Sequence, residues 1–411
     1  WDTEPGGSAP RTRRGRLTRH LPPLDGPQVR LLVLACLAVL LVAVDSQALV
    51  LALNAIGRQF HAHLADLTDL GVLIQLGAVA GLGLGLLSDR LGRRRVLIVS
   101  VAGFSLANVA SAAAPNLAVL AGLRVVAVSL ETGAGATATA LVIEELPAAA
   151  RAFGISILTI AAGAGAGVST VLWPFIAPNW RVLYLLGAAG LVGAGALFLW
   201  LRESRAWTGS GEHRGLALAV LLRRAWRGRL LIAVTTTLLS AVLYVPANLF
   251  YAVRGDQLGM GQFEISGVIV VGAVLSIPAF FAGAALSDRL GRRRPAVVLS
   301  VITAGCVAIA FAGGAAVYWT GNILWTIFAS AGSPVTGTWF GELFPTRARA
   351  TSGALSSVFG SVGGVLGFEL LSALGTRHGL GFAILWCAGV AAVGALLLAL
   401  LPETLGRPLP E

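Results

Sequence analysis

The sequence carries little charge, no lysine and few cysteines for its length. Only 12% of its 411 residues are charged, and all 30 basic residues are Arg. Soluble globular domains carry about 25% charged residues, so this composition excludes an ordinary soluble domain. Cys36, Cys306 and Cys387 lie singly in apolar runs without metal-ligand spacing. We therefore expect neither a cysteine metal site nor a disulfide.

The sequence also lacks the short motifs of the common enzyme classes. It contains no Gly-x-Ser-x-Gly nucleophile motif, no helical zinc motif and no glycine-rich phosphate loop that ends in Lys. His61 and His63 would supply only two metal ligands, and we interpret them as loop residues. We therefore expect a protein that is not an enzyme and that needs no metal or other cofactor.

Long apolar runs dominate the sequence instead. Hydrophobic residues make up 56% of the chain, and its mean hydropathy is +0.82. Runs of about 20 apolar residues, long enough for a helix to cross a bilayer, recur throughout and do not alternate with polar residues as transmembrane strands do. The sequence therefore predicts an all-α membrane protein. We place its twelve transmembrane helices at residues 30–56, 69–87, 95–114, 117–143, 153–177, 181–201, 229–253, 265–286, 295–314, 316–341, 353–376 and 380–401.

The placement of Arg predicts the orientation in the membrane. Of the 30 Arg, 25 lie before the first span, after the last span, or in the connections that follow spans 2, 4, 6, 8 and 10. Arg124 lies inside a span. The remaining connections hold only Arg58, Arg181, Arg254 and Arg377. Connections rich in Arg stay in the cytoplasm, so we expect a multi-pass protein of the cell inner (plasma) membrane with both termini cytoplasmic. The net charge of +11 then reflects topology, and we expect no nucleic-acid partner.

Two motifs occur twice in the chain at almost the same interval. Leu87–Arg95 reads LSDRLGRRR, and the same nine letters return at Leu286–Arg294. A second pattern, Glu-x-x-Pro-x-x-x-Arg, begins at Glu144 and again at Glu342. Two different motifs repeated at one period predict two homologous halves, an organisation typical of transporters built from repeats.

The repeats and the Arg-rich connections divide the chain into five segments. We expect a disordered basic cytoplasmic tail at 1–29, a six-helix bundle at 30–201, a cytoplasmic linker at 202–228, a second six-helix bundle at 229–401 and a cytoplasmic tail at 402–411. The linker mixes Arg with Leu, Val and Trp. It forms either an amphipathic helix on the anionic inner leaflet or an ordinary solvated connection.

These motifs resemble those of the major facilitator superfamily of transporters. Gly85–Arg94 is similar to the loop signature G-x-L-x-D-R-x-G-R-R of that superfamily, and the patterns at Glu144 and Glu342 resemble loops of its sugar porter and organic ion (metabolite) transporter branches. Glu203–Trp207 and Pro402–Glu411 resemble the segments after spans 6 and 12 in the same branches. The resemblance implies two pseudo-symmetric six-helix bundles around a cavity lined by spans 1, 4, 7 and 10, with alternating access by rocking of the halves.

The resemblance also implies a gate built from charged side chains at the cytoplasmic helix ends. Such residues would pair between helices and lock the outward-open state. The alternative is that the Arg residues serve only as topological anchors. The gating residues carried over to this chain are Asp89, Arg90, Arg93, Glu144, Arg151, Asp288, Arg289, Glu342 and Arg349.

Four Asp, Glu or Arg residues lie deep inside predicted spans, away from the span ends, where a charge costs at least about 2.5 kcal/mol and marks a candidate functional site. They are Asp45, Arg124, Glu131 and Glu369. Arg124 and Glu131 are seven residues apart and share one helical face, and their depths bracket that of Asp45. If spans 1 and 4 are neighbours, as the resemblance implies, an Asp-Arg-Glu cluster forms. We predict that this cluster couples transport to protons, with Asp45 as the carrier, and a static buried ion pair is the alternative.

Polar and aromatic residues of the spans supply the predicted substrate cavity. These residues are Gln47, Gln75, Tyr244, Asn248, Trp325 and Glu369. The double-Gln motif of sugar porters is missing from span 7, which counts against a hexose. We predict a monomeric secondary transporter of a small organic solute, of the organic or aromatic acid type, working by proton-coupled symport. A drug/proton antiporter and a sugar/proton symporter are the alternatives.

Overall fold

The computed structural model describes residues 24–147, 150–203, 220–345 and 348–405. Within these ranges the chain forms helices and no strand. The first half holds α1 (Gly26–Gln59), α2 (Leu64–Leu91), α3 (Arg93–Ala112), α4 (Leu117–Glu145), α5 (Arg151–Ile176), α6 (Trp180–Leu185) and α7 (Ala188–Trp200). The second half holds α9 (Arg224–Gln257), α10 (Gln262–Leu290), α11 (Arg293–Ala312), α12 (Ala315–Leu343), α13 (Arg349–His378), α14 (Leu380–Leu397) and the short 3-10 helix η5 (Leu398–Leu400).

The described helices cross the molecule twelve times, because α6 and α7 together make one span, Trp180–Trp200. Eleven of these spans are long and apolar enough to cross a membrane by their length and composition. The twelfth, α12, has the length but carries more polar side chains, among them Asn322, Thr326, Ser333 and Thr336. The predicted all-α membrane fold with twelve spans is confirmed.

Most helices extend a few residues past the predicted spans, since a helix does not end where the hydrocarbon ends. Helix α9 begins at Arg224, inside the segment predicted as a linker. Residues 204–219, which make up most of the predicted linker, lie outside the described residues, as does most of the predicted N-terminal tail. The interfacial helix expected in the later part of the linker stays a prediction. The boundaries of the five predicted segments stay predictions.

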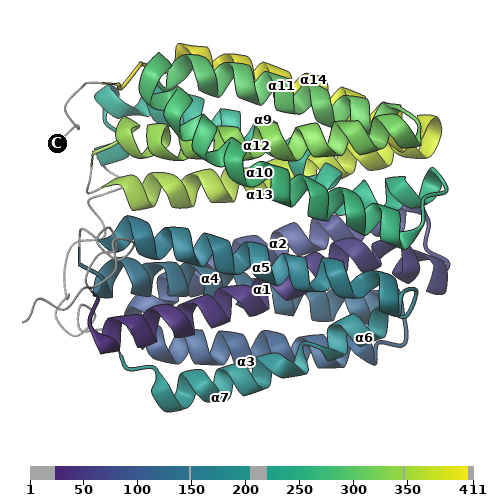
Figure 1. The fold of residues 1–411 in the computed structure, drawn as a ribbon, viewed down its shortest axis with the longest axis horizontal. Coiled ribbons are helices and arrows are strands. Elements are labelled where there is room, and N and C mark those ends of the chain that lie inside the picture. Colours follow the sequence, from purple (N-terminus) through teal and green to yellow (C-terminus); the bar gives the residue numbers. More distant parts are fainter. Residues whose placement is uncertain (1–23, 148–149, 204–219, 346–347, 406–411) are drawn as a thin grey trace, which may run out of the picture.

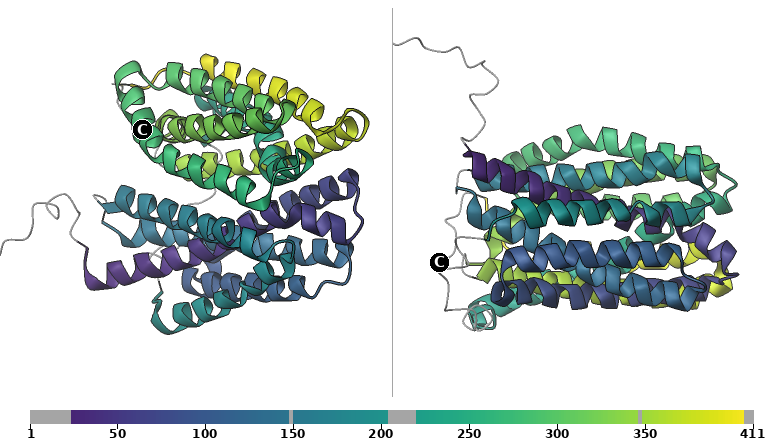
Figure 2. Two further views of the ribbon diagram at one scale, coloured as in Figure 1. Left: turned by 45° about the vertical axis from the view of Figure 1, so that its right-hand side comes forward. Right: turned by 90° about the horizontal axis from the view of Figure 1, so that it is seen from below.

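The two halves form two bundles that lie side by side (Figure 1). The main packing partners match between the halves, since α1 packs on α5 as α9 packs on α13, and α2 packs on α4 as α10 packs on α12. Across the interface α1 contacts α9, α2 contacts α13, and α5 contacts α10. The start of α1 and the last described residues lie at one end of the bundles, called the terminal end below, and the other end is called the opposite end (Figures 1 and 2).

Glycines set the closest helix contacts at matching places in the two halves. A Cβ added to Gly165 of α5 would overlap the backbone oxygen of Leu40 in α1. A Cβ added to Gly363 of α13 would overlap the backbone oxygen of Leu238 in α9. Gly363 lies 198 positions after Gly165, and Leu238 lies 198 positions after Leu40. Small residues allow this close approach in membrane bundles. The duplication read from the motifs therefore extends to the packing.

Each repeated loop turns at a glycine, and a glutamate of the same half caps the helix that follows the loop. Gly92 and Gly291 have φ angles of 98° and 90°, a conformation that other residues adopt only with strain. Glu203 accepts the backbone N–H of Arg94 at 3.0 Å. Glu403 accepts the backbone N–H of Arg292 at 2.9 Å. A glutamate from the end of each half thus caps the first turn of α3 or α11.

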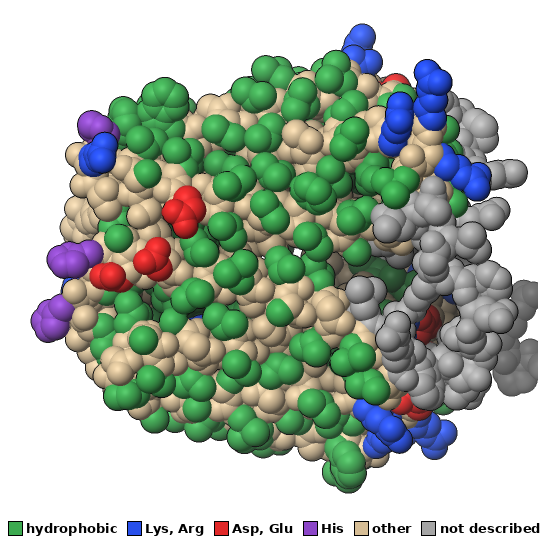
Figure 3. Space-filling model, turned by 180° about the vertical axis from the view of Figure 1, so that it is seen from behind, with side chains coloured by type: hydrophobic (Ala, Val, Ile, Leu, Met, Phe, Trp, Pro, Cys, Tyr) green, Lys and Arg blue, Asp and Glu red, His purple; other side chains and the backbone are tan. Residues whose placement is uncertain are grey.

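The outer surface is apolar around its middle. Large hydrophobic side chains such as Phe175, Phe198, Phe281 and Leu400 are exposed along the outer faces of the helices. In Figure 3 apolar side chains cover the middle of the face shown, while Arg side chains gather towards the terminal end and His side chains at the opposite end. This distribution matches a multi-pass protein whose apolar belt faces lipid.

Candidate functional site

A cavity of about 920 Å³ lies between the two halves. Helices α1, α2 and α4 line it from the first half, and α9, α11, α12 and α13 line it from the second. The resemblance implied a lining by spans 1, 4, 7 and 10, which are α1, α4, α9 and α12. The structure adds α2, α11 and α13.

The cavity is closed towards the opposite end of the molecule. Among the described residues, every hydrogen bond, ion pair and ring contact that joins the halves lies in the half of the helices nearest that end. Gln47 bonds to the Tyr251 hydroxyl at 3.1 Å, and Trp173 donates to Gln262 at 2.6 Å. The surface between the halves is hollowed towards the terminal end (Figure 3). The structure therefore represents the state whose cavity faces the terminal end.

A buried cluster of three charged side chains forms part of the cavity wall. Arg124 of α4 donates to both carboxylate oxygens of Asp45 in α1, at 3.2 and 2.6 Å, and lies 3.5 Å from Glu131. Ser46 donates to the other oxygen of Glu131 at 3.3 Å. Arg124 and Glu131 line the cavity, and all three charged side chains are at most 5% exposed. The structure thus brings the predicted Asp-Arg-Glu cluster together.

Two polar residues that sequence reasoning missed complete the surroundings of Arg124. Asn108 of α3 accepts a hydrogen bond from Nη1 of Arg124. The ring of Tyr184 in α6 lies 5.1 Å from the guanidinium carbon. A lone Asn in an apolar span was the only sequence signal for Asn108, and one Tyr in span 6 gave no signal by itself.

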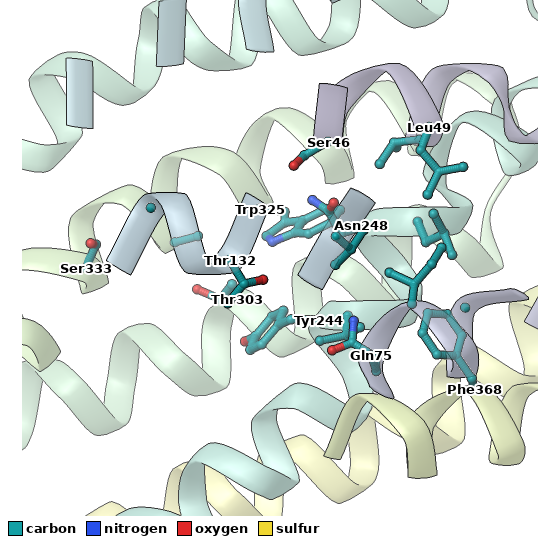
Figure 4. Close-up of a pocket in the computed structure, with 18 of the residues that line it drawn as sticks. Ser46, Leu49, Gln75, Thr132, Tyr244, Asn248, Thr303, Trp325, Ser333 and Phe368 are labelled. Atoms are coloured by element: carbon teal, nitrogen blue, oxygen red, sulfur yellow. The ribbon is translucent and has the colours of Figure 1, made fainter. Parts of the chain in front are cut away.

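The rest of the cavity wall is uncharged. Among its lining residues only Arg124 and Glu131 carry charge, and both belong to the first half. The second half contributes the rings of Tyr244, Trp325 and Phe368. Amides and hydroxyls are interspersed with them, and the residues labelled in Figure 4 come from both halves and converge on one space. Such a wall suits a solute with an apolar ring and a few polar groups.

Four of the six residues predicted for the substrate cavity line it: Gln75, Tyr244, Asn248 and Trp325. Gln47 does not line it, because its amide bonds to Thr170 and Tyr251 in the closed part of the interface. Glu369 is exposed and does not line it either. Its neighbour Phe368 faces the cavity, and successive residues of a helix point about 100° apart. The placement of Gln47 and Glu369 in the cavity is therefore corrected.

The predicted gating residues of the first half pair inside that half. Nε of Arg93 donates to Glu144 at 2.6 Å, and Nη1 of Arg93 donates to Ser88 at 3.1 Å. Arg151 donates to the backbone oxygen of Leu146 at 3.3 Å. The side chains of Asp89 and Arg90, also predicted for the gate, lie outside the described part of the structure.

The second half repeats this arrangement with a residue that the prediction omitted. Arg292, the counterpart of Arg93 in the repeat, donates to Asp288 at 2.8 Å and lies 3.4 Å from Glu342. Arg349 donates to the backbone oxygen of Phe344 at 3.2 Å, as Arg151 does to Leu146. Arg289 is exposed. Aligning the two copies letter by letter would have identified Arg292.

Comparison with known proteins relates this geometry to a family. The Major Facilitator Superfamily is the family whose model matches the chain, over residues 35–368. Solute carrier family 22 member 6 from Bos taurus is 26% identical over 384 residues, which cover 82% of this chain and 68% of the relative. NiaP from Bacillus subtilis (strain 168), named as a niacin/nicotinamide transporter, is 25% identical over 391 residues, which cover 92% of this chain and 96% of the relative.

Solved structures show the same fold. The inward-open xylose transporter XylE from E. coli superposes with a TM-score of 0.75, covering 93% of this chain and 98% of that chain, at 18% sequence identity. At this identity the likeness concerns the fold alone.

Proposed function

Because this chain belongs to the Major Facilitator Superfamily and is thus a membrane transporter of a small solute rather than an enzyme, we propose that it carries a small organic acid together with protons. The two halves expose the central cavity to one side of the membrane at a time. The structure described here corresponds to the state that is open at the terminal end.

The observation that carries this proposal is the buried Arg124 held by two carboxylates at the cavity wall. Asp45 occupies both terminal nitrogens of the guanidinium, and Glu131 approaches one of them. A solute carboxylate can bind Arg124 only when one of these acids releases it. A buried acid that takes up a proton loses its charge and with it most of its attraction to the guanidinium. One proton and one carboxylate therefore enter the site together.

The uncharged part of the cavity supports an aromatic or otherwise flat acid. Trp325 and Tyr244 offer ring faces for stacking, and the amides of Gln75 and Asn248 can bond to ring nitrogens or hydroxyls. The name of NiaP, a niacin/nicotinamide transporter, points to the same class. No second positive charge lines the cavity among the described residues, which favours a monocarboxylate over a dicarboxylate.

Uptake into proteoliposomes tests the proposal directly. Vesicles with an inward proton gradient should accumulate labelled nicotinate or benzoate, and a protonophore should abolish accumulation. Nicotinamide has the same ring but no carboxylate, so it serves as the matched control and should not accumulate with the gradient. Gradient-driven glucose uptake, or proton-driven extrusion of ethidium without uptake of either acid, would replace this proposal with a sugar symporter or a drug antiporter.

The charged pairs at the terminal end are proposed to act as a gate. In this open state Arg93 binds Glu144, and Arg292 binds Asp288 and Glu342, each inside its own half. When the terminal end closes, these groups come close enough to the other half to exchange partners. The gate then stabilises the state that opens at the opposite end.

The orientation is proposed from the Arg-rich terminal end. We place the protein in the cell inner membrane as a monomer with both termini in the cytoplasm. A cysteine at the exposed Arg377 should react with an impermeant reagent added to intact cells, and a cysteine at the exposed Arg294 should not. The reverse labelling would contradict the orientation. The mass of the purified protein in nanodiscs tests the monomer.

A further inference from the structure

Arg124 is held by two kinds of groups, the acids Asp45 and Glu131 and two uncharged side chains that do not line the cavity. Asp45 and Glu131 contact its terminal nitrogens. Asn108 also accepts from Nη1, and the Tyr184 ring lies against the guanidinium. A cation over an aromatic face is attracted by the ring, most strongly where water is excluded.

The Asn108 side chain is fixed in place by its surroundings. It is 0% exposed, and a Cβ added to Gly187, between α6 and α7, would lie 2.6 Å from the Cβ of Asn108. The oxygen of Asn108 binds Arg124, while its Nδ2 finds no partner among the described residues. Since a buried unpaired donor is costly, the site keeps this amide at the expense of stability, which argues for a role beyond packing.

The hydrogen bond from Arg124 to Asn108 does not depend on pH, because an amide neither gains nor loses a proton. The groups around the guanidinium that can do so are Asp45 from α1, Glu131 from α4 and Tyr184 from α6. No other described side chain contributes charge to this site, and α3 supplies an amide there instead of an acid.

We propose that Asn108 is a positioning residue that keeps Arg124 in place while Asp45 or Glu131 is protonated. The inference rests on the proposed proton coupling. When an acid becomes neutral, Asn108 and the Tyr184 ring still hold the guanidinium at the cavity wall. Arg124 is then available to a solute carboxylate instead of following the remaining acid.

Two substitutions of Asn108 should shift protonation in opposite directions. Asn108→Ala removes the neutral acceptor, so Arg124 depends more on Asp45 and Glu131, and these acids keep their charge to lower pH. Asn108→Asp adds a third carboxylate to the cluster, which repels the other two and lets them take up a proton at higher pH. The loss of one hydrogen bond to a charged group corresponds to a shift of at most about 1 to 2 pH units.

Infrared difference spectroscopy of the purified protein measures the pH at which these acids take up a proton, without a solute. The carbonyl band of protonated carboxyl groups is followed against pH and assigned by its loss in Asp45→Asn and Glu131→Gln. Asn322→Ala is the control, because Asn322 is also a buried amide inside a span but bonds to the backbone oxygen of Tyr318, away from the cluster. It should titrate like the parent protein.

The outcomes separate the inference from the proposed function. Midpoints that move down for Asn108→Ala and up for Asn108→Asp support the positioning role. Equal midpoints, or shifts of both variants in one direction as general loosening would produce, overturn it. If the parent protein shows no titrating band that depends on Asp45 or Glu131, the proposed proton coupling itself fails, and the inference fails with it.

Discussion

Asn54 of α1 donates a side-chain hydrogen bond to Asp256 of α9, and this bond joins the two halves at the opposite end of the molecule. Asp256 also accepts from Gln262 at 2.8 Å and lies 3.6 Å from Arg58. Gln262 in turn accepts from Trp173 of α5. One carboxylate therefore connects the α1–α9 contact to the α5–α10 contact. These bonds must break before the cavity can open at this end.

Asp256→Ala should shift the protein towards the state that is open at the opposite end. Hydrogen bonds to charged groups contribute roughly 1.5 to 3 kcal/mol each, so we expect the population ratio to change about tenfold or more. Spin labels on cysteines at Ala62 and Gly261, in a background without the native cysteines, report the distance across this end. Asp69→Ala, an exposed acid at the same end, is the control. An unchanged distance distribution in Asp256→Ala would exclude a latch role.

Asp45→Asn should abolish uptake driven by a pH gradient, because it imitates the protonated acid permanently. Exchange of solute across the membrane needs no net proton movement and should continue. Proteoliposomes loaded with unlabelled nicotinate measure both activities. The stability of the variant is measured alongside, since removing one partner of a buried ion pair is destabilising.

Glu131→Gln should reduce pH-driven uptake less than Asp45→Asn does. Glu131 lies 3.5 Å from Arg124, whereas Asp45 makes two bonds to it. The opposite ranking of the two variants in the same uptake assay would make Glu131 the proton carrier. If neither variant differed from the parent protein, the proton would have to travel by another route.

Glu144→Gln and Glu342→Gln should change the rate of transport more than the affinity for solute. Each removes the charge that holds Arg93 or Arg292 at the terminal end, and neither glutamate lines the cavity. We expect turnover to change several-fold while the equilibrium Kd stays within about twofold. Binding by calorimetry and uptake rates in vesicles provide the comparison. A large loss of affinity at normal turnover would argue against a gate.

The stability that Glu403 contributes should disappear in acid. Burial alone would raise the pKa of Glu403, but the backbone N–H groups of Arg292, Leu405, Arg293 and Thr404 outweigh it and lower the pKa. A lowered pKa means that the stabilisation is complete above the unfolded value of about 4.3 and is lost as the pH falls through the folded value.

The difference in unfolding temperature between the parent protein and Glu403→Gln measures this contribution. It should be largest near neutral pH and shrink as the pH falls below about 4. Asp69→Asn serves as an exposed control and should show no such trend. A difference that stays constant with pH would mean that the backbone bonds to Glu403 do not depend on its charge.

The sequence by itself determined the fold, the number of spans and the family. Hydropathy is a local property, and a run of about 20 apolar residues in a membrane has few alternatives to a helix. The repeated motifs predicted the division into two homologous halves. The positive φ at Gly92 and Gly291 agrees with the tight turn expected in each copy. The likeness to transporters of the Major Facilitator Superfamily, read from these motifs, is confirmed.

Only the tertiary structure decided which side chains face the cavity. Gln47 and Glu369 are polar residues at suitable depths, yet their neighbours Ser46 and Phe368 line the cavity instead. Asn108, on a span not expected to take part, meets Arg124 across a helix interface. The reason is geometric, because successive residues of a helix point about 100° apart and the face that meets the cavity is set by packing between helices distant in the chain.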